Sequence, residues 1–413
     1  MNVNHYKRKA CRQCNSQDLD IAVKLNATPL ANDYISEKDL KIEKKVYPLD
    51  VYFCNDCKHL QLLDVVNPKT LFENYVYVSG TSPVFVKHFE KYAKYLNSKF
   101  NSKGLAIDIG SNDGTILKAF KSLGYKVLGI EPAKEIAKEA INNGIETIID
   151  FFNPSIALNI KKEYGEASII TANNVFAHID DPIMFLDGIS QILSAENGIF
   201  CFEVSYLRDV VENTFFDTIY HEHLDYHTLL PLKGFLERNG FEIIDALRVS
   251  THGGSIRVIS QKKGGNYKVS NSIRELISEE QKLGLHKLDT FQQFSEKINQ
   301  CGKDLRSILR ELKAQDKTIV GYGAPAKATT LMYQFGIGLE TIDYIIDDSK
   351  WKQFLYSPGK HIPIYPKEFI EVKRPDYILI LAWNFASSII KNNQEFRFSG
   401  GKFIIPLPSI EIV

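Results

Sequence analysis

The sequence predicts an α/β protein built on a mainly parallel, doubly wound sheet, with a small N-terminal domain and a second, smaller α/β unit at the C-terminus. Three observations lead to this fold class. Short apolar runs alternate with helical patterns between residues 105 and 205, and the alternation begins again after residue 318. Ahead of both, four cysteines stand in two closely spaced pairs. These blocks give predicted domains at 1–75, 76–250 and 251–413.

Length and composition exclude several classes of protein. The 50 Lys and Arg residues balance the 50 Asp and Glu residues, so the formal net charge is zero. A balanced chain has no charge excess to attract a polyanion over a broad surface, which argues against a nucleic-acid binder. We expect no membrane span, because no apolar run reaches about 18 residues. The basic N-terminus has no apolar segment behind it, so we expect no secretory signal and a cytoplasmic location.

The first block holds too few apolar residues for an independent core, so it needs a cross-link or a bound metal to stabilise it. Strands are expected over 51–54 and 59–66. The block also carries two CxxC pairs, formed by Cys11, Cys14, Cys54 and Cys57. A redox pair would follow a strand and begin a helix, and neither pair does. Four thiolates instead satisfy the tetrahedral preference of Zn²⁺ and leave no open position, which predicts a structural zinc site.

The second block is the source of the doubly wound sheet. Alternating patterns predict helices over 82–100, 115–124, 134–144 and 182–193. Short apolar runs predict strands over 105–110, 127–132, 146–150, 167–174 and 198–205. Strands that alternate with helices are typical of parallel sheets, whose ligands bind at the carboxyl ends of the strands.

A glycine-rich turn joins the first strand and helix of this sheet. Gly110 and Gly114 let the backbone approach a ligand, and acids or amides end the next three strands. This pattern favours an adenosyl ligand without a pyrophosphate, since the dinucleotide motif would need glycine at position 112. The alternative is that the acids only cap helices. The candidate cofactor residues are Asp108, Gly110, Asn112, Asp113, Gly114, Glu131, Asp150, Phe151 and Asn173.

The segment Tyr220-His221-Glu222-His223 is the candidate for acid–base chemistry. Two histidines and a carboxylate so close together can supply a base with an orienting partner. Two alternatives stay open: a metal held by His221 and His223, or a histidine that only fills the core. His178, after the fourth strand, is a weaker candidate that could simply shape its loop.

The third block repeats the strand–helix pattern. We expect a strand over 255–261, a long helical stretch over 271–315 and a helix over 326–336. Further strands are expected over 318–324, 342–348, 377–383 and 402–408. Two glycine turns each offer backbone N–H groups and one cation, which suits a pyrophosphate, although ordinary turn glycines are the alternative. The candidate substrate residues here are His252, Gly253, Gly254, Arg257, Tyr322, Gly323, Ala324 and Lys327, with Asp347 and His361 as further candidates for selecting the nucleoside.

Taken in order, these motifs resemble the sugar C-methyltransferases of deoxysugar biosynthesis. The order is CxxC and CxxC, NYVYVSGTSP, IDIGSNDGTIL, YHEHLDY, HGGSIR and GYGAPAKA, which covers nearly the whole chain. The resemblance implies a zinc domain, a class I methyltransferase core of Rossmann-like fold that binds S-adenosylmethionine, and a C-terminal domain for a nucleotide-diphosphate keto-sugar. It implies a substrate with a 4-keto group that is methylated at C3 through an enolate.

The resemblance also implies residue roles. His223 matches the histidine base of the family and Glu222 its carboxylate partner. Tyr75 matches the family tyrosine, with Tyr77 a close second that we group with the substrate residues. Tyr75 and His178 would donate to the enolate oxygen, and Tyr220 occupies an aromatic position of the family. The enzyme would need no metal for the transfer itself, and we expect a monomer or a weak dimer.

Other functions remain open at this point. One is an NAD(P)-dependent oxidoreductase acting on a nucleotide sugar, because the turn at 321–326 differs from GxGxxG only by Ala326, which the pattern permits. A zinc-containing methyltransferase for another small molecule and a non-enzymatic zinc-stapled binding module are further alternatives. A nucleic-acid methyltransferase is disfavoured by the balanced charge and by the absence of the [DN]-PP-[YF] motif after the fourth strand.

Overall fold

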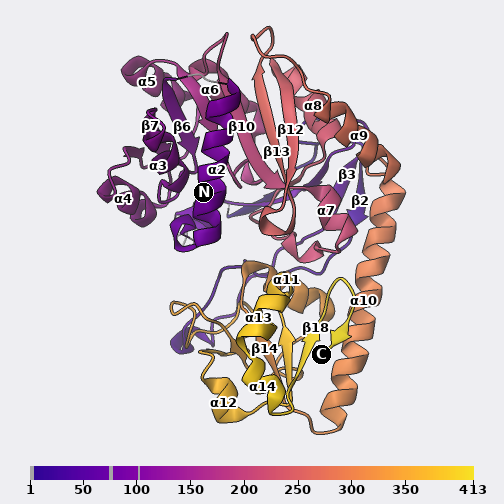
Figure 1. Cartoon of the computed structure of the whole chain (residues 1–413). Coiled ribbons are helices and arrows are strands. Elements are labelled where there is room, and N and C mark those ends of the chain that lie inside the picture. The colour runs from indigo at the N-terminus through magenta and orange to yellow at the C-terminus, as the bar shows by residue number, and fades with distance from the viewer. Residues whose placement is uncertain (1–3, 74–77, 101–102) are drawn as a thin grey trace.

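The computed structural model describes residues 4–73, 78–100 and 103–413. Within them the chain forms a seven-stranded, a six-stranded and a four-stranded sheet, together with a two-stranded ribbon. The seven-stranded sheet lies in the upper body of Figure 1 and the six-stranded sheet in the lower body. The described residues include no helix that is both long and apolar enough to cross a bilayer.

The central sheet has the order β12-β13-β10-β9-β6-β7-β8. Its parallel part comprises β6 (Leu105–Ile109), β7 (Lys126–Ile130), β8 (Thr147–Ile148), β9 (Ala167–Thr171) and β10 (Ile199–Ser205). An antiparallel pair, β13 (Ser255–Lys262) and β12 (Phe241–Val249), completes the edge next to β10. The doubly wound sheet predicted from the sequence is therefore confirmed, with one strand, β13, running against its neighbours.

Helices cover both faces of this sheet. They are α2 (Pro83–Phe100), α3 (Thr115–Ser122), α4 (Lys134–Asn142), α5 (Pro154–Tyr164), α6 (Pro182–Ile192) and α8 (Leu229–Arg238), with the short α7 (Leu207–Glu212) after β10. Local chemistry sets their starts. The side chains of Asn153 and Asp181 cap α5 and α6 by accepting from the N–H groups of Ile156 and Met184, and a proline follows each cap. Apolar side chains from the two helical layers and the strands form two cores, one on each face.

One predicted strand belongs to a different sheet from the one expected. The strand expected over 255–261 was assigned to the C-terminal block, but β13 lies in the central sheet between β10 and β12. Residues 241–262 form an antiparallel pair whose side chains are buried on both faces. Continuous burial removes the alternation that reveals a surface strand, so the sequence alone does not say which sheet receives it.

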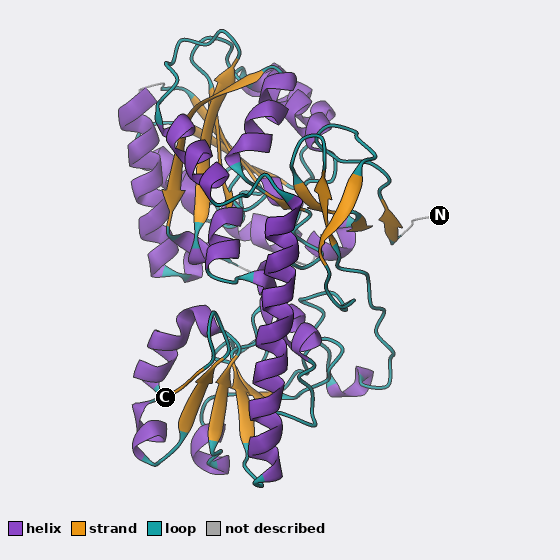
Figure 2. Cartoon of the chain, turned by 90° about the vertical axis from the view of Figure 1, so that its right-hand side faces the viewer, coloured by secondary structure: helices purple, strands orange, loops and turns teal. Residues whose placement is uncertain are grey.

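The predicted helical stretch over 271–315 divides into α9 (Ser272–Lys282) and α10 (Leu288–Ala314). The break falls near Gly284, whose φ is +72°. Figures 1 and 2 show α10 running from the upper body down the side of the lower one. Its apolar face also packs on the N-terminal sheet, where the ring of Phe291 lies 5.9 Å from that of Phe53.

The C-terminal domain repeats the parallel pattern. Its strands are β14 (Ile319–Tyr322), β15 (Ile345–Ile346), β16 (Ile364–Tyr365), β17 (Tyr377–Ile380), β18 (Lys402–Ile405) and β19 (Glu411–Ile412), in the order β16-β15-β14-β17-β18-β19. All pairings except that of β18 with β19 are parallel. The helices are α11 (Ala326–Phe335), α12 (Phe369–Lys373), α13 (Ala386–Asn392) and α14 (Gln394–Phe398).

The N-terminal domain is joined to both other domains. Its sheet has the order β11-β4-β3-β2, with β2 (Leu19–Val23), β3 (Val51–Cys54), β4 (Leu60–Leu62) and β11 (Asp225–Tyr226), so one strand comes from the central block. The strand expected over 59–66 is in fact β4 and β5 (Asp64–Val66), and β5 pairs with β1 (His5–Lys7). The short α1 (Pro68–Phe72) follows β5. Between β2 and β3 the chain reaches the C-terminal domain, where Tyr34 donates to the Ala324 carbonyl at 2.5 Å.

Candidate active site

The four predicted zinc ligands come together in the N-terminal domain. The Sγ atoms of Cys11, Cys14, Cys54 and Cys57 all lie within 4.8 Å of one another. Two tight turns present them, one after β1 and one after β3, and Cys11 and Cys54 are buried. Four thiolates at this spacing fit a closed tetrahedral site, which is the arrangement of structural rather than catalytic zinc. Among the described residues this is the group of side chains suited to a metal.

The glycine turn after β6 is built as a cradle. Gly110 has φ +69°, and a Cβ there would lie 2.4 Å from the Val175 side chain, so only glycine fits. Its N–H donates to the Ile130 carbonyl at 2.8 Å. Gly114, the N-cap residue of α3, has φ +76°. The turn therefore holds its backbone close to the carboxyl ends of β6 and β7, where the predicted ligand would lie.

The predicted acids of this edge have separate surroundings. Glu131 accepts from the backbone N–H groups of Asn112 and Ala133 at 2.9 and 2.8 Å, and its burial raises its pKa. Asp108 is buried, which raises its pKa well above the ordinary value, and it accepts from the Thr171 hydroxyl at 2.5 Å. Glu131 thus holds the turn through the N–H of Asn112, whereas Asp108 joins β6 to β9.

Asn173 lies two residues after the end of β9, and its side-chain amide is buried. Neither its Oδ1 nor its Nδ2 has a hydrogen-bond partner among the described residues, although both atoms are buried. A buried amide left unpaired costs about 1–3 kcal/mol, so such a group points to a ligand. Together with the cradle at Gly110, this orphaned amide fits a polar cofactor bound across the ends of β6, β7 and β9.

Asp150 and Phe151 lie at the rim of this edge. β8 ends at Ile148, so both residues follow the strand instead of ending it, and Asp150 is exposed with its carboxylate accepting from the N–H of Phe151 at 2.7 Å. Their predicted contacts with the cofactor stay predictions.

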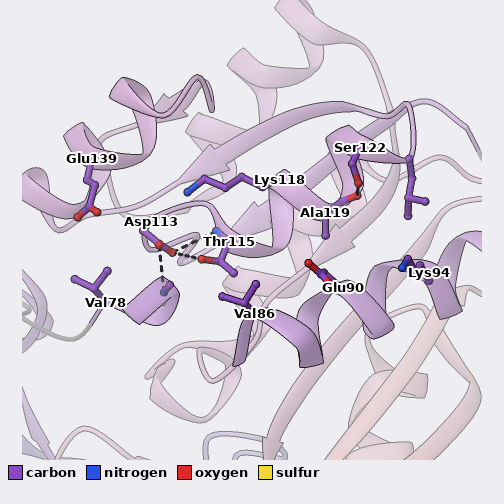
Figure 3. Close-up of a pocket in the computed structure, with 12 residues that line it drawn as sticks. Val78, Val86, Glu90, Lys94, Asp113, Thr115, Lys118, Ala119, Ser122 and Glu139 are labelled. Carbon is purple, nitrogen blue, oxygen red and sulfur yellow. Dashed lines mark hydrogen bonds between the residues drawn. The ribbon is translucent and has the colours of Figure 1, made fainter. Parts of the chain in front are cut away.

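A cavity of about 660 Å³ opens beside the glycine turn, between α2 and α3. Asp113 is the predicted cofactor residue in its wall, where it accepts from Thr115 and from the N–H of Gly80 at 3.2 Å (Figure 3). The lining mixes acidic and basic side chains such as Glu90 and Lys118. The remaining predicted cofactor residues lie outside this lining.

The predicted catalytic rings form a stack. The ring centres of His178 and His223 are 5.1 Å apart and the two rings are nearly parallel. The ring centre of Tyr220 lies 4.1 Å from that of His223. Phe72 continues the stack, with its ring 5.3 Å from that of His178. Residues from α1, the loop after β9 and the segment before β11 thus converge, as predicted for His178, Tyr220 and His223. Tyr75 and Tyr77 lie outside the described residues.

A backbone contact helps to orient the His223 ring. Its Nδ1 is 2.7 Å from the carbonyl oxygen of Thr218. Since a carbonyl only accepts, Nδ1 carries the hydrogen and Nε2 is the nitrogen that can take up a proton. Burial and the neighbouring His223 hold the pKa of His178 well below its usual value, so His178 is a neutral imidazole. Nε2 is thus the basic nitrogen of the His223 ring, and the neighbouring His178 ring is uncharged.

Glu222 lies on another side of the turn. Its described contact is to Asn32 of the N-terminal domain, whose Nδ2 donates to Oε1 at 2.8 Å. Successive side chains of a tight turn diverge, so His223 contacts the Thr218 carbonyl while Glu222 contacts Asn32. The predicted pairing of Glu222 with His223 stays a prediction. Burial raises the pKa of Glu222 from 4.5 to about 7.

This buried carboxyl should leave a signature in the pH dependence of stability. A folded-state pKa above the unfolded one means that the native protein binds the extra proton, so wild-type stability falls as pH rises from about 4.5 to 7. The loss due to this group is about 3 kcal/mol. In the Glu222→Gln variant that decline should disappear, so the variant gains on wild type between pH 5 and 8 in urea unfolding. Parallel stability curves for the two proteins would contradict this.

His221 faces away from the ring stack. Its Nε2 donates to the Pro48 carbonyl at 3.1 Å, and its ring contacts Tyr47 at 5.6 Å. A metal site shared by His221 and His223 is therefore not assembled within the described residues. His221 is instead a contact between the central and N-terminal domains.

The glycine turn of the C-terminal domain lies at the domain junction. Gly323 has φ +88° and donates to the Ile346 carbonyl at 2.7 Å, while the N–H of Ala324 donates to Asp347 at 2.6 Å. These two N–H groups are thus used within the protein. The N–H donors that a helix leaves unpaired in its first turn lie next to them, at the start of α11. Tyr322 contacts Asp348 through its hydroxyl at 3.2 Å, and burial raises the pKa of Tyr322 to about 12.

Lys327 extends from α11 over aromatic rings. Its Nζ lies 5.0 Å from the Trp383 ring and 5.7 Å from that of Phe215, and it donates to Asn384 at 2.5 Å. Burial lowers its pKa. Trp383 also donates to Asp217 at 2.7 Å. Since Asp217 directly precedes Thr218, the Lys327 cluster and the ring stack are neighbours.

The first glycine turn approaches the same place. A Cβ at Gly253 would lie 2.8 Å from the Phe215 ring, which itself stacks on Trp383 at 4.6 Å, and Gly254 packs against Asp209. The backbone of His252 lies in the short turn Thr251–Gly253. Both predicted glycine turns thus border Phe215.

Arg257 does not fit its predicted role as a phosphate-binding cation. It lies in β13 of the central sheet, nearly buried, with its Nε donating to Glu203 at 2.6 Å and its guanidinium 3.6 Å above the Tyr92 ring. Burial favours a raised pKa for Glu203, but the bond from His88 and the charge of Arg257 hold that pKa below its ordinary value. The charge of Arg257 is thus neutralised inside the sheet, and the sequence shows no sign of this pairing because Glu203 is far away along the chain.

An Arg257→Met substitution should therefore affect stability and not substrate affinity. It leaves Glu203 as a buried charge with His88 as its remaining partner, which should cost about 3 kcal/mol. Urea unfolding would measure this loss. The double variant Arg257→Met/Glu203→Gln should recover part of the lost stability. In the single and the double variant alike, KM for the sugar substrate should stay at the wild-type value. A raised KM with unchanged stability would restore the phosphate role.

Several functional contacts were missed by the sequence analysis. Thr218 and Trp383 lie in short 3-10 helices and Asn32 lies in a turn, with no motif around them. Asp217 lies three residues before the segment Tyr220–His223, and its acidic side chain is the one signal that the sequence offers.

Comparison with known proteins places this geometry in a family. Three family models match consecutive parts of the chain: a zinc binding domain over residues 11–72, a methyltransferase domain over 86–246 and a C-methyltransferase C-terminal domain over 250–408. The C-methyltransferase NovU of Streptomyces niveus is 33% identical over 405 residues, which are 98% of this chain and 96% of NovU.

Solved structures also resemble part of the chain. An S-adenosylmethionine-dependent methyltransferase from Clostridium acetobutylicum is 16% identical, with 43% of this chain and 92% of that one covered and a TM-score of 0.36. The magnesium protoporphyrin IX methyltransferase of Synechocystis with bound S-adenosylmethionine is 15% identical, with 43% and 79% covered and a TM-score of 0.32. The family rests on the full-length relative and on the three consecutive models. The chain belongs to the S-adenosylmethionine-dependent C-methyltransferases that carry a zinc-binding domain ahead of the methyltransferase domain.

Proposed function

We propose that this enzyme methylates C3 of a nucleotide-linked 4-keto-deoxysugar through an enolate, with His223 as the base. The observation that carries the proposal is the orientation of His223, whose Nδ1 is held by the Thr218 carbonyl at 2.7 Å. A histidine fixed in this way presents Nε2 as its proton acceptor, which is what a base for an acidic C–H requires.

The first step is removal of the C3 proton. The proton moves to Nε2 of His223, and the electron pair of the C–H bond forms the enolate with the C4 carbonyl. The resulting imidazolium keeps its Nδ1–H bond to Thr218. A neutral His178 beside it adds no second positive charge and can donate a hydrogen bond to the developing oxygen charge, as can the Tyr220 hydroxyl.

The methyl donor would be held at the carboxyl edge of the central sheet. Asn112 and Gly110 shape the turn, Glu131 faces it, and the unpaired Asn173 amide supplies a polar contact. When bound, S-adenosylmethionine would supply an electrophilic methyl group to the C3 carbon of the enolate, with the sulfonium S–CH3 bond breaking to leave S-adenosylhomocysteine. The protein contributes position and the exclusion of water from the enolate.

The nucleotide would be recognised by the C-terminal domain. The first turn of α11 offers N–H groups, Lys327 supplies a cation, and Trp383 with Phe215 supplies aromatic faces. Since the chain as a whole carries zero net charge, recognition of a diphosphate has to be local. Asp347 follows the second strand of this domain, where an acid suits ribose hydroxyls.

The test is incubation with labelled S-adenosylmethionine and a panel of dTDP-, GDP-, CDP- and UDP-linked 4-keto-deoxysugars. The product should carry the label on C3, as NMR would show. In deuterated buffer, the C3 proton should exchange when the methyl donor is replaced by its demethylated product. Transfer to a different acceptor, or micromolar NADH binding without S-adenosylmethionine binding, would overturn the proposal.

A further inference from the structure

The segment that carries His223 is built into the sheet of the N-terminal domain. Residues Asp225 and Tyr226 form β11, which pairs antiparallel with β4 opposite Gln61 and Leu60. The N–H of Leu62 donates to the Leu224 carbonyl at 2.8 Å. Three consecutive residues after His223 are therefore hydrogen-bonded to a strand that leads directly from the second cysteine pair.

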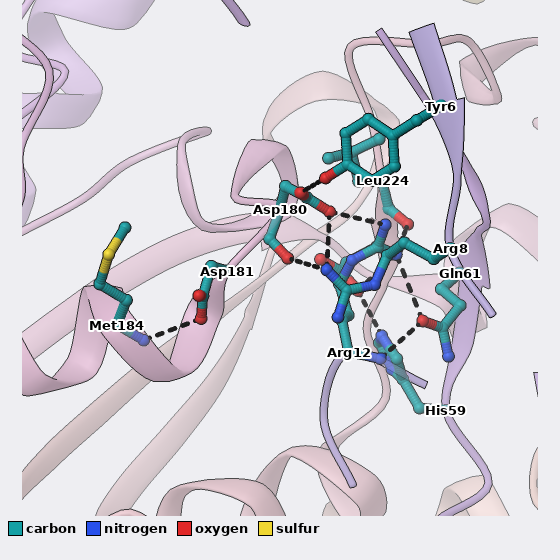
Figure 4. A network of polar contacts seen from close by, with 10 residues as sticks. Tyr6, Arg8, Arg12, His59, Gln61, Asp180, Asp181, Met184 and Leu224 are labelled. Carbon is teal, nitrogen blue, oxygen red and sulfur yellow. Dashed lines mark hydrogen bonds and ion pairs between the residues drawn. The ribbon is translucent and has the colours of Figure 1, made fainter. Parts of the chain in front are cut away.

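Arg12 makes the closest link between this segment and the cysteine site. It lies between Cys11 and Cys14 and is 1% exposed. Its Nη1 donates to the Leu224 carbonyl at 2.9 Å and lies 3.6 Å from the Asp225 carboxylate. Figure 4 shows its guanidinium enclosed by Leu224, Gln61 and Asp180. A turn that holds two of the predicted zinc ligands thus contacts the residue next to His223.

The second cysteine pair reaches the same segment. His59 follows Cys57 by two positions, is fully buried, and its Nε2 contacts Asp225 at 2.5 Å. Burial favours a raised pKa for Asp225, but Arg12 and His59 outweigh it and hold that pKa below its ordinary value. Asp225 is consequently a charged anchor, clamped from both turns that carry the cysteines.

These anchors bear on the position of the His223 ring. The His223 carbonyl accepts from the Tyr226 hydroxyl at 2.9 Å, and the His223 N–H donates to the Tyr220 carbonyl at 2.8 Å. With Leu224 fixed by Arg12 and Tyr226 fixed in β11, the backbone that follows His223 is held at two points. Even a small shift of Leu224 would be enough to separate Nδ1 of His223 from the Thr218 carbonyl, because a hydrogen bond is lost beyond about 3.5 Å.

We infer that Arg12 is a positioning residue, which couples the folded cysteine site to the orientation of His223. The chemical role of His223 rests on the proposed function, whereas the coupling does not. Removal of a supporting group of this kind typically lowers activity by about 10- to 100-fold. The N-terminal domain is on this view a part of the active-site scaffold and not a separate module.

The test compares Arg12→Met with Arg306→Met in the full-length, zinc-loaded protein. Arg306 is a matched control because its Nη1 also donates to a backbone carbonyl, that of Phe335, in the C-terminal domain. After loss of Arg12, Asp180 keeps its contacts with Arg8 and Asp225 keeps His59. For each variant, zinc content, amide hydrogen exchange over 220–228, kcat and KM for S-adenosylmethionine are measured.

Arg12→Met should keep its zinc and its KM for S-adenosylmethionine, exchange the amides of 222–226 at least about 10-fold faster, and lose about 10- to 100-fold in kcat. Arg306→Met should match wild type in exchange and in kcat. Unchanged exchange and kcat in zinc-loaded Arg12→Met would overturn the inference. If Arg12→Met does not fold, the isosteric Asp225→Asn serves in its place, with the same expected and contradicting results.

The exchange measurement needs no substrate, so it separates this inference from the proposed function. If His223→Gln retains full activity while Arg12→Met loosens 222–226, the base assignment fails and the coupling stands. If His223→Gln is inactive while Arg12→Met changes neither exchange nor kcat, the coupling fails and the base assignment stands.

Discussion

Replacing His223 by Gln should lower kcat by about 10³-fold, within the range that general-base catalysis contributes. The glutamine amide can still donate to the Thr218 carbonyl, so the segment should keep its shape. It lacks the basic lone pair that Nε2 of histidine provides, so the C3 proton has no acceptor. We expect KM for S-adenosylmethionine to stay within about 2-fold of wild type, since His223 is not among the candidate cofactor residues. Steady-state kinetics with the labelled methyl donor measure both values.

His221→Gln is the matched control for this experiment. His221 is two positions away, is buried and also bonds a backbone carbonyl, that of Pro48, but it faces the N-terminal domain. We expect its kcat to fall less than about 5-fold. Wild-type turnover in His223→Gln, or equal losses in the two variants, would mean that the base lies elsewhere.

Replacing Cys54 by Ser should have the largest effect on the fold. Cys54 is fully buried at the end of β3, and its thiol lies 3.5 Å from that of Cys14. A structural zinc contributes about 10–16 kcal/mol to the folding of the domain that binds it, and loss of a ligand forfeits much of that. The variant should be purified without zinc, unfold at a markedly lower temperature and show little turnover, because β11 and the His223 segment depend on the same sheet.

Cys301→Ser controls for the loss of a thiol. Cys301 lies in α10, half-buried and away from the cysteine cluster. We expect it to keep one zinc per chain and to shift the free energy of unfolding by less than about 1 kcal/mol. Metal analysis and thermal unfolding of both variants decide the matter. A zinc-free Cys54→Ser protein with wild-type stability would show that the metal does not hold this domain.

Local patterns identified most of the central and C-terminal elements. The alternation of strands and helices between β6 and β10 is visible in the sequence because each element is amphipathic or apolar within about a dozen residues. The predicted strands are generally longer than the observed ones, as at 146–150, where β8 spans Thr147–Ile148. β12 was not predicted, and the strand at β13 was predicted but assigned to the C-terminal block, because its place depends on which buried sheet edge it pairs with.

The candidate site, like the fold, was predicted from the sequence only in part. The four cysteines and the rings of His178, Tyr220 and His223 were predicted as groups and are found together. Arg257 was predicted as a phosphate ligand because its glycine-rich context suggested one. Its partner Glu203 lies on a neighbouring strand 54 residues earlier, and no motif joins the two.

By itself, the sequence determined the fold class, the zinc ligands and the motif order that marks the C-methyltransferases, since each depends on residues close together in the chain or on their order. Only the tertiary structure decided which groups orient His223 and how the zinc-binding turn reaches it. Those contacts join residues far apart, as Arg12 and Leu224 are across 212 positions. They depend on burial, because a guanidinium removed from water must bond whatever acceptor the fold brings to it.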